Sequence, residues 1–153
     1  MGGSAENTEE GATCHGVFDE EGSAKTHIGM WNIHKVTTFY NMLNRTRSAN
    51  PYTSAWDTQE VVTFYGVFDQ AASAKPDTSG WNTHKVTTYY NMFYRAGSAN
   101  PDTSAWVTQE VVTFAGVLAQ AASHNPDPRA WNTLKAIPYT HIRAPDTSPH
   151  PVL

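Results

Sequence analysis

The stretch "SANPDTSAW" runs from Ser98 to Trp106, and the chain repeats it with small changes. A near-identical copy, "SANPYTSAW", covers Ser48 to Trp56, and looser copies end at Trp81 and Trp131. All five tryptophans of the chain are spaced by 25 residues. A fixed period of this length is typical of a solenoid, in which every repeat forms one coil and neighbouring coils share a core.

Apolar residues recur in the same register as the tryptophans. Because the tryptophans occupy one position of every coil, we expect them to face inward, although an exposed row of tryptophans could instead stack sugars or bases. Leu and Ile are scarce, so aromatic residues must supply much of the core. We predict these structural anchors of the repeat: Trp31, Trp56, Trp81, Trp106, Trp131, Phe18, Phe68 and Phe93.

Each 25-residue unit contains two kinds of local pattern. The "NPDTSAW" part has a proline corner and then a segment rich in Ser and Thr, which favours a short strand paired with the coils on either side. The "VTTYYNMFYRA" part, residues 86–96, places apolar residues at helical spacing, which favours a short helix or helical turn. The sequence therefore predicts a repeat solenoid of about five such units, with a β-solenoid as the alternative.

A second period of 50 residues lies over the first. Residues 31–78 resemble residues 81–128 more closely than neighbouring 25-residue units resemble each other, so odd and even coils are distinct. Large and small residues alternate in this way at Asn41 and Gly66. Lysine and glutamate also alternate at one position, and because paired coils lie about 4.8 Å apart, they predict an inter-coil charge ladder that fixes register. Its members are Lys35, Glu60, Lys85, Glu110 and Lys135.

The composition bounds the class of protein. A chain of 153 residues with 39% hydrophobic residues fits one domain, and its formal charge of −4 gives no electrostatic reason to expect nucleic acid as a partner. No apolar run is long enough for a membrane helix, and the N-terminus lacks the basic and apolar parts of a secretory signal. We expect a disordered or loose cap at 1–13, one solenoid domain at 14–137 and a proline-rich tail at 138–153.

The repeated residues follow the pattern W-[DN]-T-x-x-V-T-x-[FYM]-x-x-[MV]-[FL]-x-x-A-x-[SA]-x-N-x-D-x-S-x-W over roughly residues 16–137. This pattern is similar to the 25-residue repeat of BspA-like surface proteins, also called the mycoplasma-lipoprotein-type repeat. The resemblance implies a right-handed solenoid of the leucine-rich-repeat-like group, with a short strand and a short helix or helical turn in each unit. It also implies an adhesive or protein-binding role at the cell surface, and it carries no catalytic residue.

The chain departs from that family on the expected strand face. Where family repeats usually have Phe before the Asn and an aliphatic residue after the Asp, this chain has Ala and Thr. These smaller, more polar residues predict a flat face that bears threonine hydroxyls. We expect the face to meet a partner through Asp77, Asp102, Asp127, Thr53, Thr78 and Thr103.

Each of these columns also has a simpler explanation. Every Asp of this column follows a proline in an expected turn, so its carboxylate could bond to local backbone amides rather than hold a cation or ligand. Threonine suits strands, and a repeat copies whatever it contains, so the threonines need not form an ice-binding array. His34 and His84 lie two coils apart, which is too far for them to share one metal ion.

Nothing in the sequence is positive evidence for catalysis. Cys14 and His15 are adjacent, but sequence neighbours rarely take up the geometry of a nucleophile and its base, and no third group is evident to orient them. The sequence contains no phosphate-cradling glycine-rich loop, and no CxxC, HExxH or GxSxG motif. We therefore expect no enzymatic activity, no cofactor and no metal site.

The function predicted from the sequence is a non-catalytic solenoid that binds a protein partner, and a small-molecule ligand is not expected. Two alternatives stay open. One is an accessory structural subunit that stabilises a larger assembly, and this assembly could be a membrane complex with which the protein associates peripherally. The other is a carbohydrate- or ice-binding solenoid. The resemblance implies an extracellular or cell-surface location, although the chain shows no signal peptide.

Overall fold

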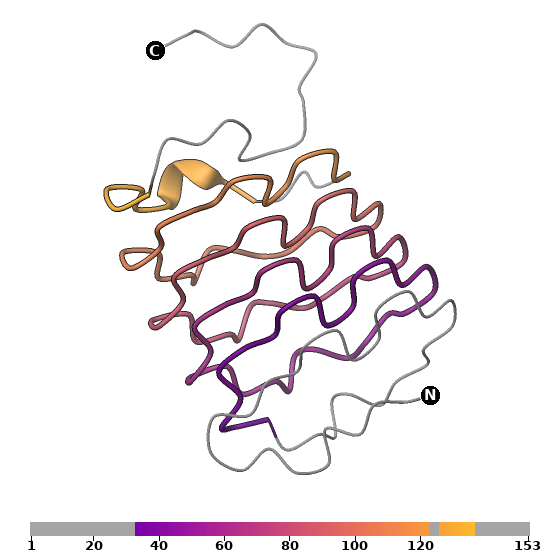
Figure 1. Ribbon diagram of the computed structural model, residues 1–153, viewed down its shortest axis with the longest axis horizontal. Helices are drawn as coiled ribbons and strands as arrows, with labels where there is room; N and C mark the ends of the chain where they lie inside the picture. Colours follow the sequence, from indigo (N-terminus) through magenta and orange to yellow (C-terminus); the bar gives the residue numbers. More distant parts are fainter. Residues whose placement is uncertain (1–32, 123–125, 137–153) are drawn as a thin grey trace, which may run out of the picture.

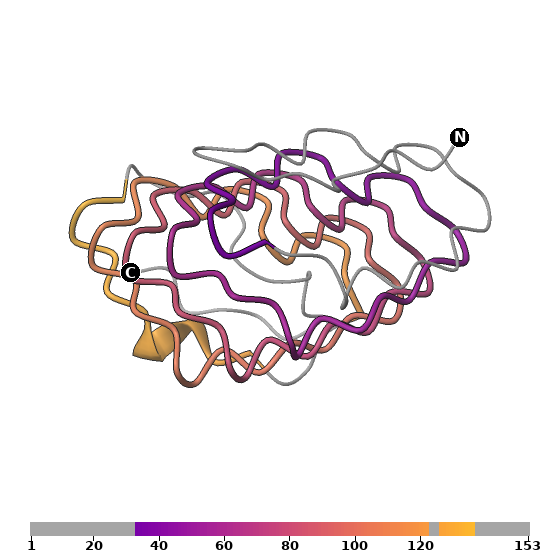
Figure 2. The same ribbon diagram turned by 90° about the horizontal axis from the view of Figure 1, so that it is seen from below.

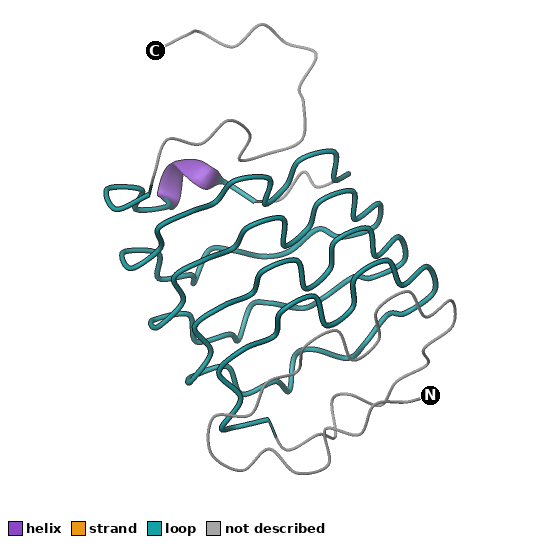
Figure 3. Ribbon diagram, viewed as in Figure 1, coloured by secondary structure: helices purple, strands orange, loops and turns teal. Residues whose placement is uncertain are grey.

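The computed structural model describes residues 33–122 and 126–136, and over these ranges the chain winds through successive coils that stack on one another (Figure 1). Loops and turns form almost all of this part of the chain, as Figure 3 shows. Its one helix is the 3-10 helix η2, Pro128–Ala130. Asp127 precedes η2 and accepts a hydrogen bond from the Arg129 amide, as an N-cap residue does. The predicted cap, residues 1–13, and the predicted tail, residues 138–153, lie outside the described residues.

Backbone hydrogen bonds join one long side of each coil to the coils above and below. The Phe64 amide donates to Thr88 O at 3.1 Å, and the Gly66 amide donates to Tyr90 O at 2.9 Å. Parallel bridges set a constant register of one 25-residue unit between coils: Thr38–Thr63, Thr63–Thr88 and Thr88–Thr113. We call this side of the coils the bridge segments, residues 38–46, 63–71, 88–96 and 113–121.

Residues 86–96, for which the sequence predicts a helix or helical turn, form consecutive tight turns and no helix. The Met92 amide bonds three residues back, to Tyr89 O at 3.0 Å, whereas the Phe93 amide donates to Val117 O of the next coil at 2.9 Å. Because alternate amides bond to the next coil, they are not available for the i to i−4 bonds of an α-helix. Two positions of each bridge segment also have left-handed backbone: Asn41, Arg45, Gly66, Gln70, Asn91, Arg95, Gly116 and Gln120.

The other long side of each coil also consists of turns, where the sequence predicts a short strand. The Trp81 amide donates to Thr78 O at 3.2 Å, and the Val86 amide donates to Thr83 O at 3.1 Å. Since these amides close local turns, they cannot form a strand ladder with the next coil. No strand occurs on this side of the described coils. We call these stretches the turn segments, residues 51–62, 76–87, 101–112 and 126–136.

The core lies between the two long sides. Figure 2 shows the coils nearly superposed, each as a flattened loop. A tryptophan of each turn segment stacks on an aromatic ring of the preceding bridge segment: the ring centroids of Phe64 and Trp81 lie 4.8 Å apart, and those of Tyr89 and Trp106 lie 4.5 Å apart. Trp31 and Phe18 lie outside the described residues. The other predicted anchors are buried: Trp56, Trp81, Trp106, Trp131, Phe68 and Phe93.

Asparagine and glycine interlock neighbouring coils in the bridge segments. A Cβ atom added to Gly66 would collide with Asn41 Oδ1, and one added to Gly116 would collide with Asn91 Oδ1. Both glycines have positive φ, 61° and 69°, a conformation that side chains disfavour. An odd coil with Asn therefore fits against an even coil with Gly, which gives the 50-residue period a steric basis.

Candidate partner-binding face

The turn segments present outward side chains in straight columns, and we call this surface the turn face. Buried residues such as Thr78, Trp81 and Val86 alternate with exposed ones along each segment. Because the buried residues are fixed by the core, the exposed columns keep their register from coil to coil. In one coil the exposed members are Asp77, Ser79, Gly80, Asn82, His84, Lys85 and Thr87.

Asp77 and Asp102 are exposed on this face, and each closes a local turn. Asp77 Oδ1 accepts bonds from the Ser79 hydroxyl at 2.7 Å and the Ser79 amide at 3.1 Å. Asp102 Oδ1 accepts a bond from the Ser104 amide at 2.9 Å. Bonds from the serine hydroxyl, and then from the serine amide, hold the pKa of both carboxyl groups below the ordinary value. Both side chains therefore carry their negative charge over a wide pH range.

Asp127, the third residue of the column, pairs with a cation. Arg129 Nε lies 2.9 Å from Asp127 Oδ1, and Arg129 Nη2 lies 3.2 Å from Asp127 Oδ2. Local turn and ion-pair contacts thus account for all three aspartates. Within the described residues, no three His, Cys, Asp or Glu side chains gather in a group that could hold a metal ion.

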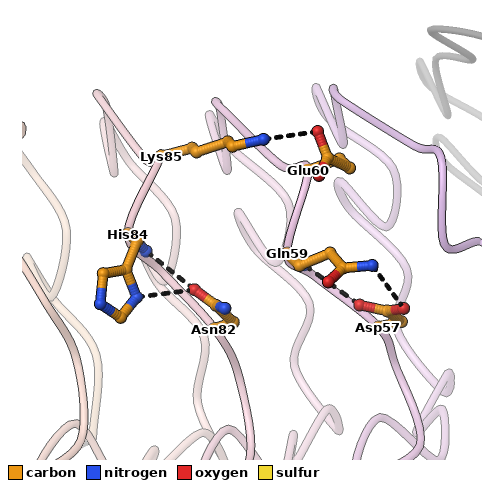
Figure 4. A network of polar contacts seen from close by, with 6 residues as sticks. All are labelled: Asp57, Gln59, Glu60, Asn82, His84 and Lys85. Atoms are coloured by element: carbon orange, nitrogen blue, oxygen red, sulfur yellow. Dashed lines mark hydrogen bonds and ion pairs between the residues drawn. The ribbon is translucent and has the colours of Figure 1, made fainter.

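A second turn repeats along the face with different residues in successive coils (Figure 4). Asn82 Oδ1 accepts a bond from the His84 amide at 3.1 Å and contacts His84 Nδ1 at 2.8 Å. In the preceding coil the Asp57 carboxylate accepts bonds from the Gln59 amide at 3.2 Å and from Gln59 Nε2 at 3.3 Å. The turn holds His84 or Gln59 at the same outward position, so coils of the two types present different chemistry on one backbone.

The alternating lysines and glutamates form pairs across the coils. Lys85 Nζ lies 2.6 Å from Glu60 Oε2, as Figure 4 shows, and Lys135 Nζ lies 2.6 Å from Glu110 Oε2. In both pairs the lysine belongs to the coil that follows the glutamate. Lys35 is exposed on the same column. Exposed ion pairs add only tenths of a kcal/mol, so their main effect is on register.

The prediction that threonines lie on the partner-facing surface is wrong. Thr53, Thr78 and Thr103 are only 1%, 0% and 5% exposed. Thr53 Oγ1 donates to Asp77 O of the next coil at 2.9 Å, and Thr78 Oγ1 donates to Asp102 O at 2.6 Å. These side chains point inward, and their hydroxyls donate hydrogen bonds to carbonyl groups of the next coil. The amides that close local turns cannot make such bonds. They are structural, and they leave the turn face to the aspartates and the charged columns.

Large apolar side chains are also exposed on the turn face. Tyr52, in the column of the aspartates, is 71% exposed, and Leu134 is 91% exposed. Val62 and Val112 are exposed at one edge of the turn segments. Of these residues, the aromatic Tyr52 is of the type that is enriched at surfaces that contact other proteins.

A further outward column, on the bridge segments, is not among the sequence-predicted sites. The ring centroids of Tyr40 and Tyr65 lie 4.5 Å apart, and those of Tyr65 and Tyr90 lie 4.7 Å apart. Burial, and then the neighbouring Tyr40 and Tyr90, raise the pKa of Tyr65. The 25-residue register already aligns these three tyrosines in the sequence, so their column could have been found from it. The next member of the column is Ala115.

In the part of the chain that the structure describes, no helix has the length and apolar character of a membrane span. No curated protein and no solved structure matches the chain. A family described as "Mycoplasma protein of unknown function, DUF285" matches residues 12–131. The match includes all five tryptophans and most of the chain, and the protein therefore belongs to this family of mycoplasma repeat proteins.

Proposed function

We propose that the protein is a non-catalytic interaction protein that binds a protein partner on its turn face. In this proposal it is a solenoid of the BspA-like, leucine-rich-repeat-like type. The observation that supports the proposal is the set of exposed columns on a fixed core. Asp77 and Asp102, the His84 and Gln59 turns, and the exposed Tyr52 project from successive coils in one register.

The chemistry of the turn face favours a protein over other partners. Both signs of charge occur on it, since Glu60 and Lys85 stand beside the aspartate column, so it offers no basic patch for nucleic acid. Local bonds already fix Asp77 and His84 before any partner arrives. The side chains of the turn face therefore lose little conformational freedom when a partner binds, and this favours affinity.

Site-specific photo-crosslinking tests the proposal in cells that naturally contain the protein. Benzoylphenylalanine is placed at Tyr52, Ser79 or Ser104 on the turn face. The matched controls carry it at Ala72 or Gly97, which are exposed positions directly after two bridge segments. We expect one discrete crosslinked species from the turn-face positions and none from the controls.

The charge of the face provides a second measurement. In the crosslinking strain, Asp77→Asn together with Asp102→Asn should weaken the crosslinked species severalfold, because the substitution removes charge while Asn can still close the turn, as Asn82 does. Equal crosslinking from both long sides, or none from the turn face, contradicts the proposal. If the partner sediments with membranes as part of a large complex, the role is that of an accessory subunit.

A further inference from the structure

The stack of outward tyrosines stops one coil before the described coils end. Tyr65 and Tyr90 stack nearly parallel, with an interplanar angle of 21°. At the equivalent position of the next coil stands Ala115, whose side chain is a single methyl group. In the described part of the chain, Tyr65 covers one face of the Tyr90 ring and no ring covers the other. Tyr90 is partly exposed, and the ring face toward Ala115 has no aromatic stacking partner among the described residues.

The coil beside this ring carries smaller side chains at two positions of its bridge segment. Ala115 and Ala119 stand where the second described coil has Tyr65 and Asp69. Gly116 is partly exposed, although the equivalent Gly66 is buried. The bridge segment 113–121 therefore carries small groups beside Tyr90, and a ligand that stacks on this ring would rest on them.

Polar groups of the same two coils form a fixed, exposed set further along the bridge segments. Arg95 Nε donates to Gln120 Oε1 at 2.8 Å, and Gln120 Nε2 donates to the Tyr94 hydroxyl at 3.4 Å. The Arg95 guanidinium lies 5.0 Å from the Tyr94 ring centroid, which is a cation–π contact. Only one of the five guanidinium N–H donors is used in the bond to Gln120, so hydrogen-bonding capacity is left over at this place.

We propose that the Tyr90 ring and this polar set together bind a short pyranose glycan. One sugar ring lays its apolar C–H face on Tyr90, in the position of the missing fourth tyrosine. The hydroxyls of the glycan exchange hydrogen bonds with Arg95 and Gln120. Such a site combines an aromatic surface with a few fixed polar groups, which is the usual composition of small-ligand sites.

Other flat ligands fit these groups less well. An aromatic side chain would stack on Tyr90 but has few ring-edge groups for Arg95 and Gln120 to bond. A nucleic acid would bring phosphates to a chain with a net charge of −4. The site lies on the bridge segments, so it is independent of the proposed protein-binding turn face, and the two proposals can fail separately.

Saturation-transfer NMR on the full chain tests the site with defined probes. The probes are maltotriose, cellotriose, chitotriose and mannotriose, with p-cresol as a ring that lacks hydroxyl-rich edges. We expect transfer to at least one trisaccharide. Tyr90→Ala should weaken its binding about tenfold, because the apolar stacking surface is lost.

A second substitution blocks the site without removing any side chain. Ala115→Tyr supplies the fourth ring of the column and should abolish trisaccharide binding, and because tyrosine already occupies this position in three coils, the fold should be kept. Tyr52→Ala, on the turn face, is the matched control and should leave binding unchanged. The proposal is overturned if no trisaccharide binds, if Ala115→Tyr leaves binding intact, or if only p-cresol binds.

Discussion

Gly66 lies at the closest approach between two coils. Its φ of 61° is left-handed, and Asn41 Oδ1 occupies the place of a Cβ atom. We expect Gly66→Ala to lower the free energy of unfolding by more than about 2 kcal/mol, because backbone strain and overpacking add together. Gly80→Ala is the control, since its nearest neighbour, Ser54 O, is 4.0 Å from the added Cβ. Urea unfolding should show almost no change for Gly80→Ala, and equal effects of the two substitutions would contradict the interlock.

Tyr89 carries a hydroxyl where the coils on both sides have Phe64 and Phe114. That hydroxyl is buried and makes no hydrogen bond of normal geometry within the described residues. Burial raises the pKa of Tyr89 by more than the adjacent Thr83 hydroxyl lowers it. The nearby Thr83 hydroxyl already donates to Val107 O and accepts from the Val107 amide. Because an unpaired buried hydroxyl costs about 1–3 kcal/mol, Tyr89→Phe should stabilise the fold by roughly 1 kcal/mol.

Urea unfolding measures this effect as well, and the reverse substitution is its matched control. Phe64→Tyr places an extra hydroxyl at the equivalent core position of the preceding coil, so it should destabilise the fold. A loss of stability in Tyr89→Phe would instead show that the hydroxyl makes a stabilising hydrogen bond in the folded protein.

Asp77 and Asp102 make the stability of the protein depend on pH at the acid end. Their pKa is lowered in the folded state, so their contribution is present above the ordinary value of 3.8 and is lost as pH falls through the lower folded value. The double variant Asp77→Asn, Asp102→Asn should therefore lose less stability on acidification than the parent. Urea midpoints at neutral pH and at about pH 3 measure the difference. A variant as acid-sensitive as the parent would show that the two carboxylates do not contribute.

Among the elements, the turn segments depend on threonine hydroxyls for cohesion. Thr78 Oγ1 donates to Asp102 O inside the protein, so Thr78→Val leaves that carbonyl oxygen without the bond. We expect a loss of about 1–3 kcal/mol in the free energy of unfolding. Thr87→Val is the control, because the Thr87 hydroxyl donates to Val62 O at the exposed surface and that oxygen also accepts from the Thr87 amide. The adjacent coils carry Val62 and Val112 at the same position. Thermal unfolding should separate the two valine variants by several degrees, and identical midpoints would count against the threonine bonds.

For these segments, the sequence predicts which residues align between coils better than it predicts the backbone conformation. The register of Trp81 with Trp56, and of Thr88 with Thr63, follows directly from the period. No helix forms at residues 86–96, where the sequence predicts a helix or helical turn. Tight turns with left-handed residues four positions apart, such as Asn91 and Arg95, also place an apolar residue every three or four positions. Spacing alone does not distinguish these turns from a helix.

The candidate site was only partly predictable for a similar reason. The exposed Asp77 and its turn follow from the proline before it, and the alternative explanation of the aspartates describes their observed contacts. The inward orientation of Thr78 does not follow, since threonine is compatible with either face until its hydroxyl partner is known. The stack of Tyr65 on Tyr90 needed the period to be applied to outward positions as well as inward ones.

For the whole molecule, the two coil types predict how the chain tolerates changes in length. Duplication of residues 51–100 adds two coils and keeps every Asn against a Gly and every Glu beside a Lys. Duplication of residues 51–75 adds one coil and places Glu60 beside a second glutamate, with Gly66 lacking its asparagine. Because stacked repeats gain stability from each native interface, the two-coil insertion should raise the thermal midpoint and the one-coil insertion should not. Equal thermal midpoints would show that the alternation of coil types does not contribute to stability.

The stacked rings also give the molecule a built-in optical signal. Trp56 and Trp81 stack at 5.6 Å, and Trp106 and Trp131 stack at 6.0 Å, with nearly parallel planes. Electronic transitions of rings this close couple to each other, so the folded chain should show paired circular-dichroism bands that vanish when the rings separate. Each tryptophan pair belongs to a different part of the stack. Removing one tryptophan at a time would therefore reveal whether the coils come apart together or from one end.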